Sequence, residues 1–298
     1  MNYDKHSGRR RFLGLSAAGV GSVFLGAEGK YCTNSQRKNN REVFDCHLHC
    51  PSSQGEKWQW YKVTHTFDDF ARYLEKAGVH KGIINCQRSY NALPEEFIAG
   101  NREVADFMNR NKGKFLGACV VNPLFLEEAL RELEYCQKEL GFVWVGELCN
   151  YMIPFDYKAK EFEELMNHVT KLKMIIALHT EGEEMDYISM KFPEATIVFA
   201  NFGDDHEYQD IFRRIQIVAS NPNFYLDTSG YGHDRVGILE YAVKTIGPDR
   251  ILFGSDFSIN DPSTVLARIN NALISEDDKQ KILSLNLKAL LSRFGKSF

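Results

Sequence analysis

Four residues of types that commonly bind metal ions stand out by their positions in this sequence: His47, His49, His179 and Asp256. Each lies toward the C-terminal end of a short apolar run that is typical of a β-strand. Because side chains alternate across a strand, His47 and His49 share one face and converge on one point. Imidazole nitrogen and carboxylate oxygen are ligands for zinc and other divalent first-row metals. The sequence therefore predicts a metal site if the fold brings these strands together.

The same alternation assigns further side chains to the faces of the first strand. Asp45 has the parity of His47 and His49, whereas Cys46 and Leu48 point to the opposite face. We therefore expect Asp45 to lie near the two histidines and to orient one of the rings, as carboxylates behind metal-binding histidines often do.

Glu147 is a fifth candidate ligand, because it lies in an otherwise apolar strand. Val143, Val145 and Glu147 share the inward parity, so the carboxylate is expected to point toward the end of the strand at which the other ligands lie. A second interpretation is an ion pair with a nearby lysine or arginine, since such pairs also place carboxylates at strand ends. If Glu147 is a ligand, a site for two metal ions becomes possible.

Eight strand-like runs recur along the chain, and each is followed by an amphipathic, helix-like segment. Helix signals include Thr66 or Asp68 at the start of 67–77, Pro94 at the start of the second helix, and Gly141 after 126–140. This alternation predicts a parallel sheet, and eight units predict a single-domain α/β fold, the (β/α)8 TIM barrel, of roughly 250 residues. A doubly wound open sheet is the alternative, but only a barrel places every strand end on one rim. The predicted strands are 42–49, 81–87, 114–123, 142–150, 174–180, 196–203, 224–230 and 250–257.

The first 40 residues differ in composition from the rest of the chain. Arg9, Arg10 and Arg11 precede an uncharged stretch at 12–27 that is rich in small residues, and 30–40 are polar without periodicity. This order is typical of a twin-arginine signal peptide and linker, and it predicts export to the periplasm or outside the cell before a barrel at 41–298. The alternative is a disordered, weakly basic N-terminus, which would leave the protein in the cytoplasm.

Replacing Arg9, Arg10 and Arg11 together with lysine tests this prediction. We expect the triple variant to stay in the cytoplasm as the full-length chain, whereas the unchanged protein loses roughly its first 27–40 residues during export. Cell fractionation and mass spectrometry of the N-terminus measure both outcomes. An unchanged location of the lysine variant would rule out the signal.

Composition restricts the partners. The chain is 44% hydrophobic and 26% charged with a net charge of −4, so it can bury a large core and has no broad basic surface for nucleic acid. The apolar stretch at 12–27 is shorter than the roughly 20 residues of a membrane-spanning helix, so no stable membrane insertion is expected after processing. The seven cysteines show no CxxC spacing and indicate neither a disulfide framework nor a thiolate metal site.

Several segments together resemble the amidohydrolase superfamily. They are Asp-Cys-His-Leu-His at 45–49, His179, Asn-Phe-Tyr-Leu-Asp-Thr-Ser at 223–229 and Arg-Ile-Leu-Phe-Gly-Ser-Asp-Phe at 250–257. The sequence is most similar to the amidohydrolase-related branch, which includes aminocarboxymuconate-semialdehyde decarboxylase and other metal-dependent enzymes, and the resemblance covers roughly 41–298. It implies a TIM barrel that binds a divalent metal ion, zinc first among them, through His47, His49, His179 and Asp256.

The sequence departs from this family at the sixth strand, where members usually have a histidine that binds metal or transfers protons. Asn201 stands at that point, and an amide cannot take up a proton in this way. His206, in the predicted loop that follows, is the candidate to replace it as a catalytic residue. His233 lies in another loop of the same face and is a candidate to bind substrate, and Asp227 is expected to hydrogen-bond a turn or a residue behind the metal ligands.

These observations predict an enzyme that acts on a small organic molecule. A bound zinc ion would lower the pKa of its water, and Asp256 would receive the proton and deliver it to the leaving group, which predicts hydrolysis of an ester, lactone or amide. Non-oxidative decarboxylation is one alternative, and we rank hydrolysis above it because the histidine of the sixth strand is absent. A non-catalytic barrel that binds a metal or ligand is another, although the complete ligand set favours an enzyme.

Overall fold

A computed structural model of the protein describes residues 41–53, 66–180, 182–203 and 208–297. Residues 41–298 form one compact unit, in which eight parallel strands pair in the order of the sequence. The eight predicted strands are confirmed, although most are shorter than their apolar runs. They are β1 (Phe44–Cys50), β2 (Lys81–Cys86), β3 (Phe115–Cys119), β4 (Trp144–Cys149), β5 (Ile175–His179), β6 (Ile197–Phe199), β7 (Phe224–Asp227) and β8 (Ile251–Leu252).

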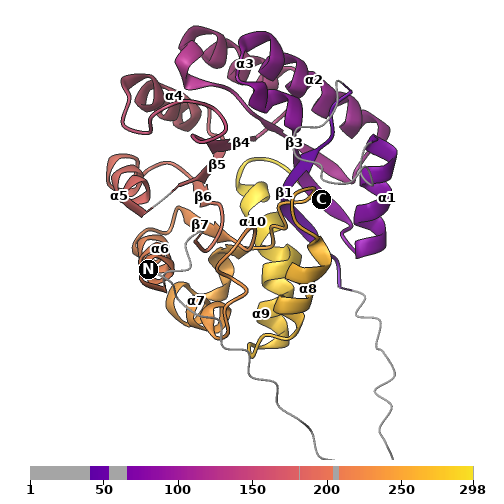
Figure 1. The fold of residues 1–298 in the computed structure, drawn as a ribbon, viewed down its shortest axis with the longest axis vertical. Helices are drawn as coiled ribbons and strands as arrows, with labels where there is room; N and C mark the ends of the chain where they lie inside the picture. The colour runs from indigo at the N-terminus through magenta and orange to yellow at the C-terminus, as the bar shows by residue number, and fades with distance from the viewer. Residues whose placement is uncertain (1–40, 54–65, 181, 204–207, 298) are drawn as a thin grey trace, which may run out of the picture. The chain divides into compact units, whose positions relative to one another are not determined.

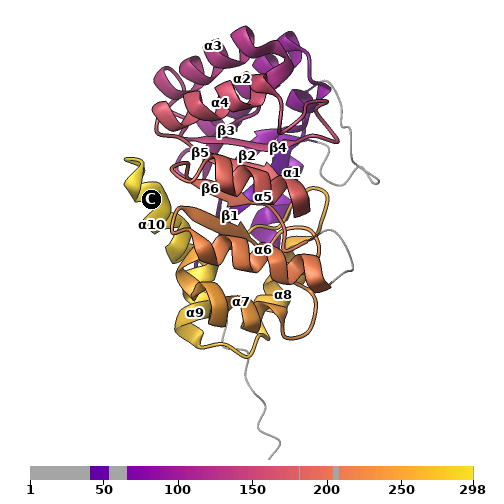
Figure 2. The same ribbon diagram turned by 90° about the vertical axis from the view of Figure 1, so that its left-hand side faces the viewer.

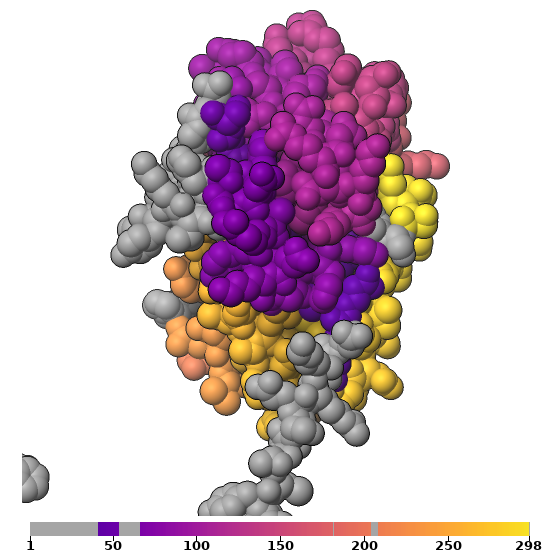
Figure 3. All heavy atoms as spheres, turned by 90° about the vertical axis from the view of Figure 1, so that its right-hand side faces the viewer, coloured from indigo at the N-terminus to yellow at the C-terminus, as the bar shows by residue number. Residues whose placement is uncertain are grey.

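The first and last strands meet and close the sheet. The amide of Cys46 donates to the carbonyl of Phe253 at 2.8 Å, and the amide of Asp256 donates to the carbonyl of His47 at 3.0 Å. A parallel bridge joins Leu48 to Phe257 just beyond the end of β8. Early, indigo segments and late, yellow segments accordingly lie side by side on the surface (Figure 3). The (β/α)8 TIM barrel is therefore confirmed, and the open-sheet alternative is excluded.

The helices follow one another around the strands (Figure 1). The side chain of Thr66 caps the first helix by accepting a hydrogen bond from the amide of Asp69, so Thr66 rather than Asp68 marks the start of this helix. The helices are α1 (Phe67–Ala77), α2 (Pro94–Arg110), α3 (Leu126–Lys138), α4 (Lys160–Lys171), α5 (Gly182–Lys191), α6 (Tyr208–Ser220), α7 (Ile238–Ile246), α8 (Pro262–Asn270), α9 (Glu276–Gln280) and α10 (Asn286–Arg293), with short helical segments η2 (Gln87–Asn91), η3 (Pro123–Phe125), η4 (Pro248–Arg250) and η5 (Lys281–Leu285).

The interior of the barrel is closed at one end by α10 (Figure 2). Leu287, Leu290 and Leu291 of this helix pack against an apolar layer to which all eight strands contribute. Trp144 is the largest buried side chain of that layer. Because this end is filled with apolar atoms, polar side chains inside the barrel collect at the other end, where the strands terminate.

The strict alternation predicted for β1 and β4 is wrong. Cys46 packs inside the barrel and Leu48 outside it, because the pairing of β1 with β2 is irregular between Asp45 and Leu48. In β4 it is Trp144 that packs inside, and Val145 packs against the helices. The pairing of β4 shifts between Val145 and Leu148, and such irregularities let two successive residues depart from alternation. The shifts still leave the histidines and Glu147 on the inside.

No helix within the described ranges has the length and apolar character needed to cross a membrane. The signal peptide predicted over residues 1–40 lies outside those ranges. Export therefore stays a prediction that the lysine variants test.

Candidate metal centre

Three side chains meet at the open end of the barrel, where β1 and the segment after β8 lie side by side. Ligand atoms of His47, His49 and Asp256 all lie within 4.8 Å of one another. Nε2 of His47 is 3.2 Å from Nε2 of His49, and that atom of His49 is 3.0 Å from Oδ1 of Asp256. The two histidines are nearly fully buried, whereas the side chain of Asp256 is 15% exposed and is the most accessible of the three.

The hydrogen bonds behind the histidines determine which ring nitrogens face the cluster. Nδ1 of His47 donates to Oδ2 of Asp227 at 3.0 Å, and Nδ1 of His49 donates to Oδ1 of Asn85 at 2.7 Å. The amide nitrogen of Asn85 donates to the carbonyl of Gly146, which leaves its oxygen for His49. In its neutral form, a ring that donates from Nδ1 keeps a lone pair on Nε2, and the Nε2 atoms of the two rings face each other. Two lone pairs 3.2 Å apart and a nearby carboxylate form a site for a cation.

The electrostatics of His47 point to the same conclusion. Burial by itself lowers the pKa of this histidine, but the carboxylates of Glu147 and Asp227 outweigh burial and raise the pKa well above its ordinary value. The two carboxylates thus favour a positive charge at this position, either as a proton on the ring or as a bound cation. Because metal binding requires the neutral ring, a divalent ion would displace this proton.

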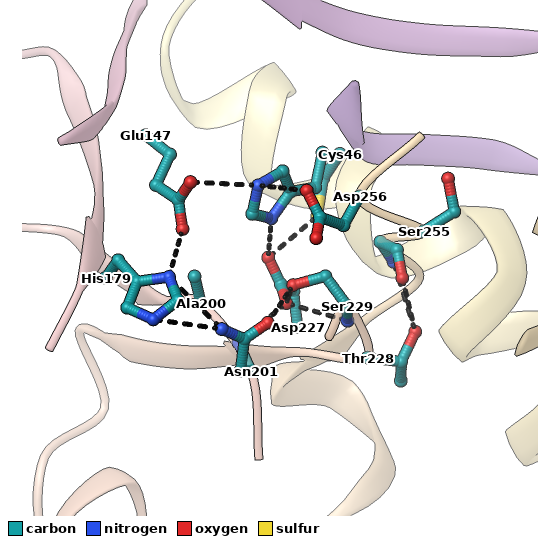
Figure 4. A network of polar contacts seen from close by, with 12 residues as sticks. Cys46, Glu147, His179, Ala200, Asn201, Asp227, Thr228, Ser229, Ser255 and Asp256 are labelled. Atoms are coloured by element: carbon teal, nitrogen blue, oxygen red, sulfur yellow. Dashed lines mark hydrogen bonds and ion pairs between the residues drawn. The ribbon is translucent and has the colours of Figure 1, made fainter. Parts of the chain in front are cut away.

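Glu147 connects this cluster to His179. Its Oε2 is 3.3 Å from Nε2 of His47. Its Oε1 is 2.9 Å from Nδ1 of His179 (Figure 4). Burial opposes ionisation of Glu147, but the two histidines outweigh burial and hold its pKa well below the usual range. Within the described part of the chain, no lysine or arginine forms an ion pair with Glu147. The alternative of a structural ion pair with a basic side chain thus has no support here.

His179 and Asn201 lie side by side at the ends of β5 and β6. The amide nitrogen of Asn201 is 3.2 Å from Nδ1 of His179, and the hydroxyl oxygen of Ser229 lies 2.7 Å from the amide oxygen of Asn201 (Figure 4). The structure therefore brings His47, His49 and Asp256 together directly, whereas His179 joins them through Glu147. Asn201 occupies the position of the absent histidine as part of this polar network.

Asp227 fixes the far side of His47. Its Oδ1 accepts hydrogen bonds from the amide of Asn201 at 3.0 Å and from the amide and hydroxyl of Ser229 at 2.9 and 2.5 Å. Burial opposes ionisation, but His47 and these donors lower the pKa of Asp227. Asp227 thus remains an anion that orients a candidate ligand, in agreement with the expectation from the sequence.

Asp256 is held by the turn that follows β8. Its backbone has a φ of 60°, in the left-handed region that aspartate and asparagine tolerate better than most residues. The side-chain amide of Asn260 donates to Oδ2 of Asp256 at 3.0 Å, which leaves Oδ1 facing His49. Asn85, Ser229 and Asn260 were not among the residues expected from the sequence. They are short polar residues at strand ends or in turns, and only the pairing of distant segments gives them a role.

Two expectations from the sequence have other outcomes. Among the hydrogen bonds of the described residues, none joins Asp45 to the ring of His47 or His49; its Oδ1 accepts from the amides of His47 and Ser255 at 2.9 and 3.0 Å. Asp45 therefore joins β1 to the segment after β8, and the expected orienting role belongs to Asp227. His206, the candidate catalytic histidine, lies outside the described residues.

His233 is buried, with 5% of its surface exposed, in the loop between β7 and α7. Burial lowers the pKa of His233 to about 4, whereas an unfolded histidine titrates near 6.5. Between these values the unfolded chain binds more protons, so stability falls as the pH falls from about 6.5 to 4. This difference in pKa corresponds to a change of about 3 kcal/mol in the free energy of unfolding.

We expect His233→Leu to remove much of this acid sensitivity. Urea denaturation at pH 7 and pH 4.5 measures the free energy of unfolding of both proteins. Equal losses of stability at pH 4.5 in the variant and the unchanged protein would contradict the role of His233 in acid sensitivity.

With this geometry in place, comparison with known proteins identifies the family. The family model described as Amidohydrolase matches residues 44–293. The chain belongs to this family. Among curated proteins, it is similar to gamma-resorcylate decarboxylase of Polaromonas sp. (strain JS666 / ATCC BAA-500), with 26% identity over 72% of this chain and 84% of the relative.

Solved structures of similar fold include 2,6-dihydroxybenzoate decarboxylase from Rhizobium, with a TM-score of 0.67 and 18% identity over 86% of this chain and 100% of the other. Another is 5-carboxyvanillate decarboxylase from Novosphingobium aromaticivorans, solved with manganese, with a TM-score of 0.69 and 12% identity over 85% and 96% of the two chains. At these identities the structural similarity supports the fold alone.

The prediction that this protein is a hydrolase is contradicted by these comparisons, since the curated relative is a decarboxylase. The mistake came from treating the absent histidine of the sixth strand as evidence against decarboxylation. Binding of a substrate by a metal ion and proton transfer by a carboxylate serve both hydrolysis and decarboxylation. Asn201 remains part of the site through its contacts with His179 and Ser229. Its identity therefore does not distinguish between the two reactions.

Proposed function

We propose that this protein is a metal-dependent, non-oxidative decarboxylase of hydroxylated aromatic carboxylates. The observation that carries the proposal is the 26% identity to gamma-resorcylate decarboxylase over 72% of the chain. The site supports it independently of that relative. Two imidazole lone pairs and the carboxylates of Glu147 and Asp256 converge at the open end of the barrel, which is the end at which TIM-barrel enzymes bind their substrates.

His47, His49, Glu147, His179 and Asp256 are the residues that we propose to hold the ion. The nitrogen and oxygen donors suit manganese or zinc, and the manganese in the Novosphingobium enzyme makes Mn²⁺ the first ion to test. When bound, a divalent ion would act as a Lewis acid that neutralises the negative charge of the substrate. The carboxylate and adjacent hydroxyl of a hydroxybenzoate supply two oxygens side by side, which is a suitable arrangement for such an ion.

Decarboxylation of a hydroxybenzoate requires one proton on the ring carbon that carries the carboxylate. When the carbon–carbon bond breaks, its electrons remain with the ring and carbon dioxide leaves, so that one proton is consumed per turnover. Asp256 is suited to deliver this proton because it is the most accessible carboxylate of the cluster and Asn260 fixes its orientation. Glu147 keeps His47 and His179 in place from the opposite side of the barrel.

The test is decarboxylation by purified protein loaded with Mn²⁺ or Zn²⁺. We expect 2,6-dihydroxybenzoate or a related ortho-hydroxybenzoate to release carbon dioxide and the corresponding phenol, detected by chromatography and by a carbon dioxide assay. Benzoate, which lacks the adjacent hydroxyl, is the matched control and should not react. A chelator should abolish the reaction, and added metal should restore it. Absence of carbon dioxide release from every hydroxybenzoate tested, with metal bound, would exclude the proposed function.

A further inference from the structure

Tyr151 is an exposed aromatic residue beside the metal centre for which the proposed chemistry gives no role. It follows β4 by two residues and is 66% exposed. Its ring packs edge to face against His179, with 5.1 Å between the ring centroids and an angle of 85° between the ring planes. The partner ring in this contact, His179, is a candidate metal ligand. Much of the Tyr151 ring remains open to another molecule.

Tyr151 reaches the candidate ligands through His179. Glu147 contacts the same histidine, with its Oε1 2.9 Å from Nδ1 of His179. Glu147 lies in β4 and Tyr151 follows this strand by two residues, so both come from the same strand end of the barrel. An aromatic ring therefore lies next to the imidazole and the carboxylate that we propose to hold the ion.

Two neighbouring tyrosines show what a structural role looks like at this site. Tyr90 and Tyr157 are fully buried, and their hydroxyls donate to the backbone carbonyls of Glu147 at 2.9 Å and Leu148 at 3.1 Å. These bonds fix the end of β4 from both sides. Within the described part of the chain, the Tyr151 hydroxyl makes no comparable bond to the backbone, and its exposed ring adds little to the core.

We propose that Tyr151 forms one wall of the substrate pocket and selects planar aromatic acids over aliphatic ones. The exposed Tyr151 ring lies against His179, and a flat aromatic substrate packs against such a ring in a way that an aliphatic acid does not. An aromatic pair strengthens binding beyond the area that it buries, by up to about tenfold. The inference rests on the proposed function for its substrate class, but it concerns binding rather than turnover.

Tyr151→Ala and Tyr151→Phe test the proposal in Mn²⁺-loaded protein. Calorimetry with the inhibitor 2-nitroresorcinol, which is bound in a similar Polaromonas decarboxylase structure, measures binding without turnover, and malonate serves as the aliphatic comparison. We expect Tyr151→Ala to weaken binding of this inhibitor about tenfold and to raise the Michaelis constant for the dihydroxybenzoate substrate similarly, with little change in kcat. Tyr151→Phe keeps the ring and should stay within about threefold of the unchanged protein.

Tyr135→Ala is the matched control, because Tyr135 is an exposed tyrosine on α3, away from the metal centre, and its loss should leave ligand binding unchanged. Unaltered affinity for the nitroresorcinol inhibitor in Tyr151→Ala, or an equal loss of malonate binding, would overturn the proposal. If the unchanged protein binds the inhibitor but releases no carbon dioxide, the proposed function fails while the role of Tyr151 is still decided by the measured affinities. If it binds no aromatic ligand, both are wrong.

Discussion

Replacing Asp256 with asparagine should reduce the rate of decarboxylation by about 10²- to 10⁴-fold. Asparagine has nearly the same shape, and its side chain can still pair with Asn260, so the turn after β8 should persist. It cannot carry a transferable proton, and its amide is a weaker metal ligand than a carboxylate. The rate of carbon dioxide release, measured with the metal-to-protein ratio and the melting temperature, separates loss of proton transfer from loss of metal or of fold.

Asp261→Asn is the matched control, five residues further along the same loop. Asp261 caps α8 by accepting a hydrogen bond from the amide of Ser263 at 2.8 Å, and asparagine caps helices about as well as aspartate. The control should therefore retain activity within about threefold. If Asp256→Asn were as active as Asp261→Asn with metal bound, another group would have to supply the proton.

Much of the fold and the centre of the site could be predicted from the sequence because the relevant signals are local. Apolar runs that alternate with amphipathic segments indicate a barrel, and a barrel places the ends of its strands on one rim. His47, His49 and Asp256 stand at such ends, so their convergence follows from topology without knowledge of any contact. Glu147 was found in the same way, as a carboxylate in an apolar strand.

The parts of the site and fold that the sequence did not predict depend on pairs of residues that are distant in the sequence. Asn85 and Asp227 determine which nitrogen of each histidine faces the cluster, yet they lie 36 and 180 positions from their partners. Nothing in the spacing of an isolated asparagine indicates such a bond. The irregular pairing of β1 and β4 was missed for a similar reason, since a shift in register arises from the neighbouring strand.

The choice between hydrolysis and decarboxylation could not be predicted from the sequence for a different reason. Histidine, glutamate and aspartate at the rim of a barrel indicate where a cation and a proton donor would lie, but both hydrolysis and decarboxylation use them. The distinction lies in the shape of the pocket and in what contacts the substrate, and such a contact is what we propose for Tyr151. Fold and ligand set therefore restrict the reaction without selecting it.

Replacing Glu147 with glutamine should lower the affinity for metal by on the order of 10- to 100-fold, the loss found when groups that support a metal site are removed. Glutamine keeps the length of the side chain but removes the negative charge that lies 3.3 Å from Nε2 of His47 and 2.9 Å from Nδ1 of His179. We expect a reduced metal-to-protein ratio and reduced decarboxylation, partly restored by excess Mn²⁺. Elemental analysis after dialysis against defined metal concentrations, with assays at each concentration, measures both.

Glu240→Gln provides the control for loss of a paired, partly buried carboxylate as such. Glu240 lies on α7 and pairs with both terminal nitrogens of Arg268 at 3.4 and 2.8 Å, so its replacement should lower the melting temperature and leave the metal content unchanged. Glu147→Gln should show the opposite pattern, because its partners are histidines that a metal ion would otherwise occupy. Full activity and an unchanged metal-to-protein ratio in Glu147→Gln would assign Glu147 a structural role. The ion would then depend on the three histidines and Asp256 alone.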